Sequence, residues 1–141
     1  MSTGKIQTGT YTIRNREFKT HAYLVDRNVN TPLTAIKTEE PWTSTTWTVT
    51  LEKDSYTIVN FKHNDHGASI EAKPSAGESV LATSKQSAWV IKETDTKGEY
   101  LISPYIDTSL FWNLTSGAEG TTIKLAKVSD NTSQWSFHLV K

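Results

Sequence analysis

Arg27 is the residue of this sequence whose type and setting most directly suggest a chemical role. It lies in the polar segment DRNVNTP, residues 26–32, between two runs of strand-forming residues at 21–25 and 33–36. The chain has three arginines, and only this one falls within a long polar loop. A guanidinium forms two parallel hydrogen bonds with a carboxylate, so Arg27 is suited to recognising an acidic group on a partner.

The residues that follow Arg27 favour a rigid loop. Pro32 has a fixed φ, and it biases Thr31 toward an extended backbone. The side chains of Asn28 and Asn30 can hydrogen-bond to the nearby backbone and hold a turn. A loop that is already ordered loses less conformational entropy when it binds a partner. The segment therefore predicts a preformed binding loop.

Other residues that could do chemistry lack the neighbours that catalysis or metal binding needs. The absence of cysteine excludes a thiol nucleophile. His and Asp cluster only at His63-Asn64-Asp65-His66, and two histidines on a turn fall short of the four ligands of structural zinc. The segment SGAEGTT, 116–122, has no helix after it and so does not resemble a phosphate-binding loop. We expect no enzymatic activity, no metal and no cofactor.

Length and charge narrow the class of protein further. The 141 residues suggest one domain, and 15 basic against 15 acidic residues give a net charge of zero. This balance argues against nucleic-acid binding and against a polybasic membrane contact. The sequence has no apolar run of the ~18 residues that a membrane span needs, and no apolar N-terminal signal segment. Together with the lack of cysteine, this leads us to expect a cytoplasmic protein.

The composition favours strands over helices. Serine and threonine make up 36 residues, and the chain has five tryptophans and five tyrosines. β-Branched and aromatic residues are typical of strands. The best helical window, TPLTAIKTEE, contains three threonines and an isoleucine and stops at Pro41. We therefore expect an all-β chain.

Two markers recur three times along the chain. The first is a tyrosine two residues before an isoleucine, and the second is a tryptophan in a strand-like run. The tyrosines are Tyr11, Tyr56 and Tyr100, and the tryptophans are Trp47, Trp89 and Trp135. The tyrosines are 45 and 44 residues apart, and each tryptophan follows its tyrosine by 36, 33 and 35 residues. Two markers that keep their spacing through three copies predict a threefold internal repeat.

Each repeat has room for four short strands separated by turn residues. The predicted strands span 10–14, 21–25, 33–37 and 46–51, then 55–61, 67–72, 79–84 and 88–92, then 99–103, 109–114, 121–126 and 134–140. Four strands repeated three times predict a β-trefoil, a single domain with lobes at about 9–53, 54–97 and 98–141. Since one lobe cannot bury its apolar face alone, we expect the repeated tyrosines and tryptophans in a shared core.

The sequence resembles the mushroom serine protease inhibitors. The resemblance covers essentially the whole chain and rests on the opening GKIQTGTYTIRN, the lobe tryptophans, the closing SQWSFHLVK and the Arg27 loop. It implies a small, stable, cytosolic protein of the fruiting body that inhibits trypsin-like serine proteases in defence against grazers. Trefoils have many functions, so the loop is the part of the resemblance that points to this one. A one-to-one inhibitor needs no dimer, and we expect a monomer.

In this interpretation the loop imitates a substrate. A trypsin-like protease has an acidic group at the base of its specificity pocket. Arg27 would enter that pocket as the P1 residue, and Asn28 would follow the scissile bond as P1′. The residues expected to contact the protease are Val25, Asp26, Arg27, Asn28, Val29 and Asn30.

Basic residues elsewhere are less suitable. Lys73 occupies the corresponding loop of the second lobe, but Pro74 follows it directly and disfavours cleavage there. The corresponding loop of the third lobe, 115–120, has no basic residue. Lys73 and Arg16 are the next candidates if Arg27 is not the contact.

A carbohydrate-binding trefoil is the alternative that the sequence leaves open. Asp107, Trp112 and Asn113 supply an acid, an aromatic and an amide, with which a pocket could hold the hydroxyls and the face of a sugar. However, ricin-type lectins carry glutamine two residues before each lobe tryptophan, where this chain has threonine or serine. This departure weakens the carbohydrate-binding hypothesis, and it favours Trp112 as a packing residue.

Overall fold

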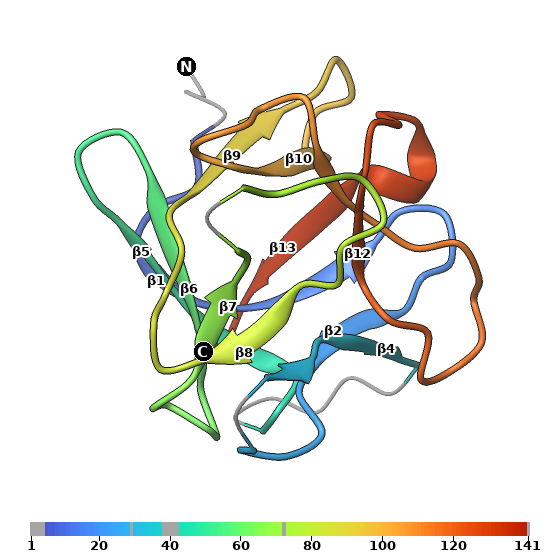
Figure 1. The fold of residues 1–141 in the computed structure, drawn as a ribbon. Coiled ribbons are helices and arrows are strands. Elements are labelled where there is room, and N and C mark those ends of the chain that lie inside the picture. The colour runs from blue at the N-terminus through green and yellow to red at the C-terminus, as the bar shows by residue number, and fades with distance from the viewer. Residues whose placement is uncertain (1–4, 29, 38–42, 72, 141) are drawn as a thin grey trace.

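Strands joined by short turns make up nearly all of the regular structure (Figure 1). The computed structural model describes residues 5–28, 30–37, 43–71 and 73–140. Within these ranges the chain forms thirteen strands and one short 3₁₀ helix, η1 (Asn131–Ser133). No helix in the same ranges is long and apolar enough to cross a membrane.

Six strands close into a barrel. They are β1 (Gly9–Asn15), β5 (Thr46–Leu51), β6 (Tyr56–Asn60), β9 (Trp89–Glu93), β10 (Tyr100–Pro104) and β13 (Trp135–Leu139). Each strand pairs antiparallel with the next, and β13 pairs with β1 to complete the ring. Closure leaves no free sheet edge within the barrel.

Three hairpins cover one end of the barrel. They are β2 (His21–Tyr23) with β4 (Thr34–Ile36), β7 (Gly67–Ser69) with β8 (Leu81–Thr83), and β11 (Phe111–Asn113) with β12 (Lys124–Ala126). The hairpins are joined by a closed ring of backbone hydrogen bonds. Leu33 N donates to Val80 O (2.9 Å), Val80 N to Ile123 O (2.9 Å), and Ile123 N to Leu33 O (2.8 Å). All three residues are fully buried.

The three lobe tryptophans occupy equivalent places in the core. The indole N–H groups of Trp47, Trp89 and Trp135 donate to the main-chain carbonyls of Ala22, Ala68 and Trp112, each at 3.0 Å. All three tryptophans are fully buried. A buried indole N–H needs a partner, and each lobe supplies it from its own hairpin.

The predicted β-trefoil is confirmed. Each of the twelve predicted strands overlaps one in the structure. The thirteenth, β3 (Thr31–Pro32), was not predicted, and it pairs with β8 of the second lobe rather than with its own hairpin. The hairpin strands are also shorter than predicted: β2 ends at Tyr23, because the chain leaves the sheet there to form the Arg27 loop.

Candidate functional site

The Arg27 loop begins at a buried anchor. The side chain of Leu24 is fully buried, and its backbone N–H donates to Ser44 O at 3.2 Å. The next residue, Val25, is 55% exposed, and Arg27 and Asn28 are exposed as well. The chain therefore turns from the core to the surface within a single residue step.

The carboxylate of Asp26 closes the turn around Arg27. Its Oδ1 accepts the backbone N–H of Asn28 at 2.9 Å and the hydroxyl of Thr31 at 2.7 Å. Thr31 Oγ1 also lies 3.0 Å from Asn28 O. The hydrogen bonds from Thr31 and Asn28 lower the pKa of Asp26, because they favour the charged carboxylate.

Asp26 closes this turn, where asparagine side chains were predicted to hold it. Among the described residues, neither the Asn28 nor the Asn30 side chain hydrogen-bonds to a backbone atom, and the acid at 26 makes the closing contact instead. Asn30 contributes a left-handed backbone with φ of 67°. Val29, which was expected to contact a protease, lies outside the described residues.

The far side of the loop is attached to the second lobe. Asn30 N donates to Ala82 O at 3.0 Å, and Thr31 pairs with Ala82 in the β3–β8 ladder. Thr31 is therefore extended, as its place before Pro32 predicts. The loop is held at both ends, at Leu24 by the core and at Asn30 by β8.

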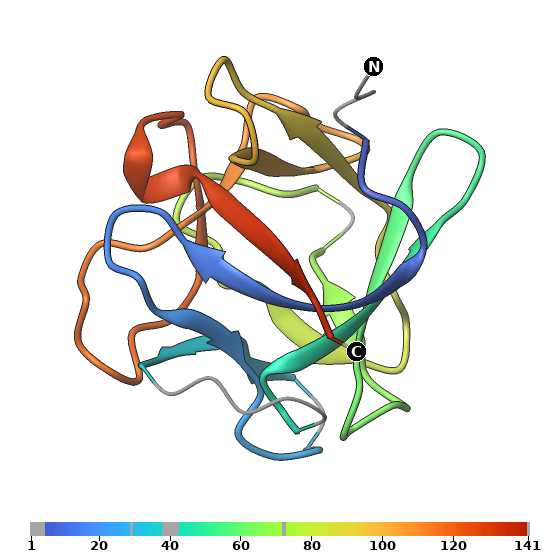
Figure 2. The same ribbon diagram turned by 180° about the vertical axis from the view of Figure 1, so that it is seen from behind.

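A second loop, residues 61–66, lies beside the Arg27 loop. The two run next to each other at the lower edge of the molecule in both ribbon views (Figures 1 and 2). Arg27 Nη2 lies 3.1 Å from Asp65 Oδ2, and the two side chains are 61% and 53% exposed. Burial lowers the pKa of the nearby His63, and the positive charges of Lys62 and Arg27 lower it further.

The sequence places residues 63–66 on a turn but does not predict the contact between Asp65 and Arg27. Asp65 follows Arg27 by 38 residues and belongs to another lobe, so no local pattern links them. The four residues do not form a metal site with their neighbours: no group of three or more possible metal ligands occurs in the described part of the chain.

The other basic candidates are placed differently. Arg16 Nη1 donates to Gln134 Oε1 at 2.6 Å and to Thr96 Oγ1 at 3.2 Å, which ties this side chain to residues of the third and second lobes. Lys73 is exposed and precedes Pro74, as the sequence indicates.

Arg16 also lies in a closed turn, because Asn15 Oδ1 accepts the N–H groups of Glu17 and Phe18, each at 3.0 Å. The Glu78 carboxylate closes the Lys73 loop in a similar way by accepting the N–H groups of Glu71 (2.9 Å) and Ser75 (3.1 Å). What distinguishes Arg27 is the attachment of its loop to β8 and a guanidinium whose ion pair is open to solvent.

The proposed sugar pocket of the third lobe is not formed. Trp112 is fully buried and meets Trp89 and Trp135 edge to face, with ring centroids 5.4 and 6.0 Å apart. Asn113 is buried, and its amide donates to Thr132 Oγ1 (2.7 Å) and Ser133 Oγ (2.8 Å). A ring enclosed by two other rings cannot stack on a sugar, so Trp112 is a core residue.

Asp107, the third member of that proposed pocket, accepts hydrogen bonds from a residue close to it in the sequence. Its Oδ1 accepts both the backbone N–H of Ser109 at 3.0 Å and the Ser109 hydroxyl at 2.6 Å. These bonds lower the pKa of Asp107 and close a turn before β11.

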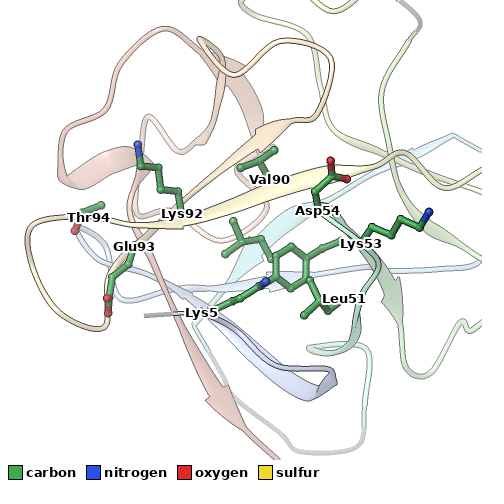
Figure 3. Close-up of a pocket in the computed structure, with 10 residues that line it drawn as sticks. Lys5, Leu51, Lys53, Asp54, Val90, Lys92, Glu93 and Thr94 are labelled. Atoms are coloured by element: carbon green, nitrogen blue, oxygen red, sulfur yellow. The ribbon is translucent and has the colours of Figure 1, made fainter. Parts of the chain in front are cut away.

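A hollow of about 580 Å³ lies between the first and second lobes (Figure 3), and no residue of the Arg27 loop lines it. Four of its five charged side chains are directed elsewhere. Lys53 and Lys92 extend away from the hollow (Figure 3). Asp54 Oδ2 accepts the Tyr105 hydroxyl at 3.0 Å, and Glu93 Oε2 accepts the Gly98 N–H at 2.8 Å. This arrangement presents no set of groups aimed at one ligand.

A second groove, of about 520 Å³, follows the hairpin of the second lobe. Its apolar part is formed by Ile70 and Leu81, and its polar rim includes Glu71, Lys85 and Gln86. The Gln86 side chain packs against Gly67, where an added Cβ would come within 2.5 Å of Gln86 Cγ. The side-chain amide of Gln86 has no hydrogen-bond partner among the described residues.

Comparisons with known proteins identify the fold. No protein-family model matches the sequence, and no curated protein matches it. Solved structures do match. The ricin B-like lectin of Macrolepiota procera, in complex with lactose, superimposes with a TM-score of 0.83 at 16% identity, over 96% of this chain and 99% of that one.

Two further structures match in the same way. The agglutinin of Rhizoctonia solani superimposes with a TM-score of 0.84 at 17% identity, over 96% of this chain and 97% of that one. The designed threefold symmetric protein ThreeFoil superimposes with a TM-score of 0.81 at 15% identity, over 92% of this chain and 98% of that one. The chain has the β-trefoil fold that these proteins share, and identities this low show the fold alone.

Proposed function

We propose that this chain inhibits trypsin-like serine proteases by presenting Arg27 as the P1 residue of a substrate-like loop. The observation that carries the proposal is the hydrogen bond from Asn28 N to Asp26 Oδ1 at 2.9 Å. Asn28 N belongs to the peptide bond between Arg27 and Asn28, which a trypsin-like enzyme would attack. That nitrogen would become the leaving amine.

The hydrogen bond between Asn28 N and Asp26 Oδ1 would favour inhibition over turnover of the loop as a substrate. A trypsin-like enzyme must transfer a proton to the leaving amine and let it depart before water can attack the acyl-enzyme. Asp26 Oδ1 holds the amine side of the bond, and Asn30 N and Thr31 attach the same side to β8. The amine would therefore stay beside the acyl group, and religation would compete with hydrolysis.

Recognition would come from the guanidinium. Arg27 is 61% exposed, and its pair with Asp65 is open to solvent, so the side chain can exchange that partner for the carboxylate of a specificity pocket. The resemblance of the sequence to mushroom serine protease inhibitors, and to cospin in particular, supports the same role. The structural matches support the trefoil without supporting that membership.

Side-by-side trypsin assays of the natural chain, Arg27→Ala and Arg27→Lys test this function. Truncating an arginine at the centre of an interface can cost ~4 kcal/mol or more, so we expect Arg27→Ala to weaken inhibition about a thousandfold. Arg27→Lys keeps the positive charge and should retain much of the inhibition. Lys73→Ala is the matched control and should inhibit like the natural chain. Equal inhibition by the natural chain and Arg27→Ala would place the contact on another loop.

Carbohydrate binding is the second candidate, and by fold alone the matched structures favour it over protease inhibition, since one of them is named as a lectin in complex with lactose and another as an agglutinin. Trp112 is buried and cannot stack on a sugar in the third lobe. The groove of the second lobe, with Gln86 on its rim, offers a more open place for a saccharide. Glycan-array binding that survives Arg27→Ala and is lost in Gln86→Ala would establish this function instead.

A further inference from the structure

The Arg27 guanidinium is paired within the chain before any partner arrives. Asp65 Oδ2 lies 3.1 Å from Arg27 Nη2, across the boundary between the first and second lobes. A trypsin-like specificity pocket offers the same chemical group, a carboxylate. Arg27 must therefore leave one carboxylate in order to reach another.

Asp65 is held in place by a buried residue. Its second oxygen, Oδ1, lies 3.0 Å from His66 Nδ1, and the His66 side chain is only 7% exposed. Because a carboxylate can only accept, the proton of this bond belongs to Nδ1. The bond from His66 lowers the pKa of Asp65, and Arg27 lowers it further, so the carboxylate is charged at neutral pH.

The turn that carries Asp65 is also fixed. Asn60 is fully buried, and its N–H donates to His66 O at 3.0 Å, while its Oδ1 accepts the N–H of His63 at 2.9 Å. The Asn60 amide group donates to Ser44 O at 2.9 Å. Ser44 O also accepts the N–H of Leu24, the anchor of the Arg27 loop. The two loops thus share one point of attachment.

We propose that Asp65, oriented by His66, is a positioning residue that holds Arg27 in the free protein and is displaced when Arg27 enters the acidic pocket of a protease. The inference rests on the proposed inhibitory function. In the complex Arg27 no longer contacts Asp65, so removing that acid facilitates docking and leaves the docked state unchanged. Asp65 therefore limits the rate of association and not the lifetime of the complex.

Asp65→Asn isolates this role. Asparagine keeps an oxygen that can accept from His66, so the turn is retained while the charge opposite Arg27 is lost. Exposed ion pairs are weak, so we expect the association rate with trypsin to rise by about two- to fivefold, with the dissociation rate unchanged. Asp95→Asn is the matched control, because Asp95 is exposed in the β9–β10 turn, at the opposite end of the molecule in both ribbon views.

Two measurements decide the inference. Rapid-mixing kinetics should show faster association for Asp65→Asn than for Asp95→Asn, whereas equal or slower association would overturn it. A carboxyl NMR titration of the free protein should show the pKa of Asp65 rising in Arg27→Ala, and an unchanged value would also overturn it. If the natural chain does not inhibit trypsin at all, the proposed function fails, while the titration still reports whether Asp65 holds Arg27.

Discussion

The main-chain carbonyl of Trp112 accepts the indole N–H of Trp135 at 3.0 Å, and the two rings meet edge to face with centroids 6.0 Å apart. In the first and second lobes the acceptor of the equivalent hydrogen bond is the carbonyl of an alanine, Ala22 and Ala68 respectively. Trp112 therefore breaks the threefold symmetry of the core by placing a large ring where the other lobes have a methyl group. The ring packs between Trp89 and Trp135.

Replacing Trp112 with alanine should strongly destabilise the fold. Truncation of a fully buried aromatic ring leaves a cavity and typically costs about 3–5 kcal/mol in the free energy of unfolding. Trp112→Phe should cost less, because it keeps most ring contacts and removes an indole N–H that has no hydrogen-bond partner among the described residues. Urea unfolding monitored by circular dichroism measures both. Natural stability in Trp112→Ala would contradict the core assignment.

Asp26→Ala should convert the proposed inhibitor into a better substrate. The variant keeps Arg27 but loses the acceptor for Asn28 N–H and for the Thr31 hydroxyl. Hydrogen bonds to charged groups are the stronger ones, so we expect inhibition of trypsin to weaken about tenfold or more. Cleavage after Arg27 should accelerate, as followed by mass spectrometry.

Asp26→Asn is the conservative companion of that variant. It retains an acceptor oxygen but loses the charge, so its inhibition should lie between that of the natural chain and Asp26→Ala. Thermal melting checks that both variants remain folded. An Asp26→Ala protein that inhibits and resists cleavage like the natural chain would show that this turn does not protect the bond.

The free energy of unfolding should fall as the pH rises above about 10. Burial raises the pKa of Tyr11, Tyr56 and Tyr100 above the model-peptide value of 10.0. The unfolded chain then loses these protons at a lower pH than the folded chain. Since the unfolded state binds fewer protons in this range, stability is fully present below pH 10 and decreases above it. Tyrosinate absorbance and urea unfolding at pH 9, 10 and 11 measure the two effects.

Tyr56→Phe separates the tyrosines from the lysines, which titrate in the same range. Tyr56 donates its hydroxyl to Ile6 O at 2.6 Å, so the variant should be less stable at neutral pH. Its stability should nevertheless decline less steeply above pH 10, because one of the shifted groups is gone. An identical slope in both proteins would assign the alkaline loss to other groups.

The sequence alone was sufficient to predict the fold. Recurrence of Tyr11, Tyr56 and Tyr100 together with Trp47, Trp89 and Trp135 predicted three lobes of four strands, and the barrel contains all six residues. This succeeds because a threefold repeat constrains both the strand period and the closure of the core. The short strand β3 could not be predicted, since its pairing partner β8 belongs to the next lobe.

Part of the candidate site could be predicted from the sequence, and part of it could not. The place of Arg27 in an exposed polar loop followed from its immediate neighbours. Local sequence did not predict the roles of Asp26, Asp65 and Trp112. Whether Asp26 closes a turn depends on where Thr31 is held by β8, and the Arg27–Asp65 pair joins residues from two lobes.

The sequence by itself thus determined the β-trefoil and the exposed arginine, because periodic burial and loop composition are local properties of the chain. Tertiary structure decided which acids contact that arginine loop and that Trp112 fills the core instead of lining a pocket. Those outcomes depend on the distances between lobes, and closure of the barrel sets these distances.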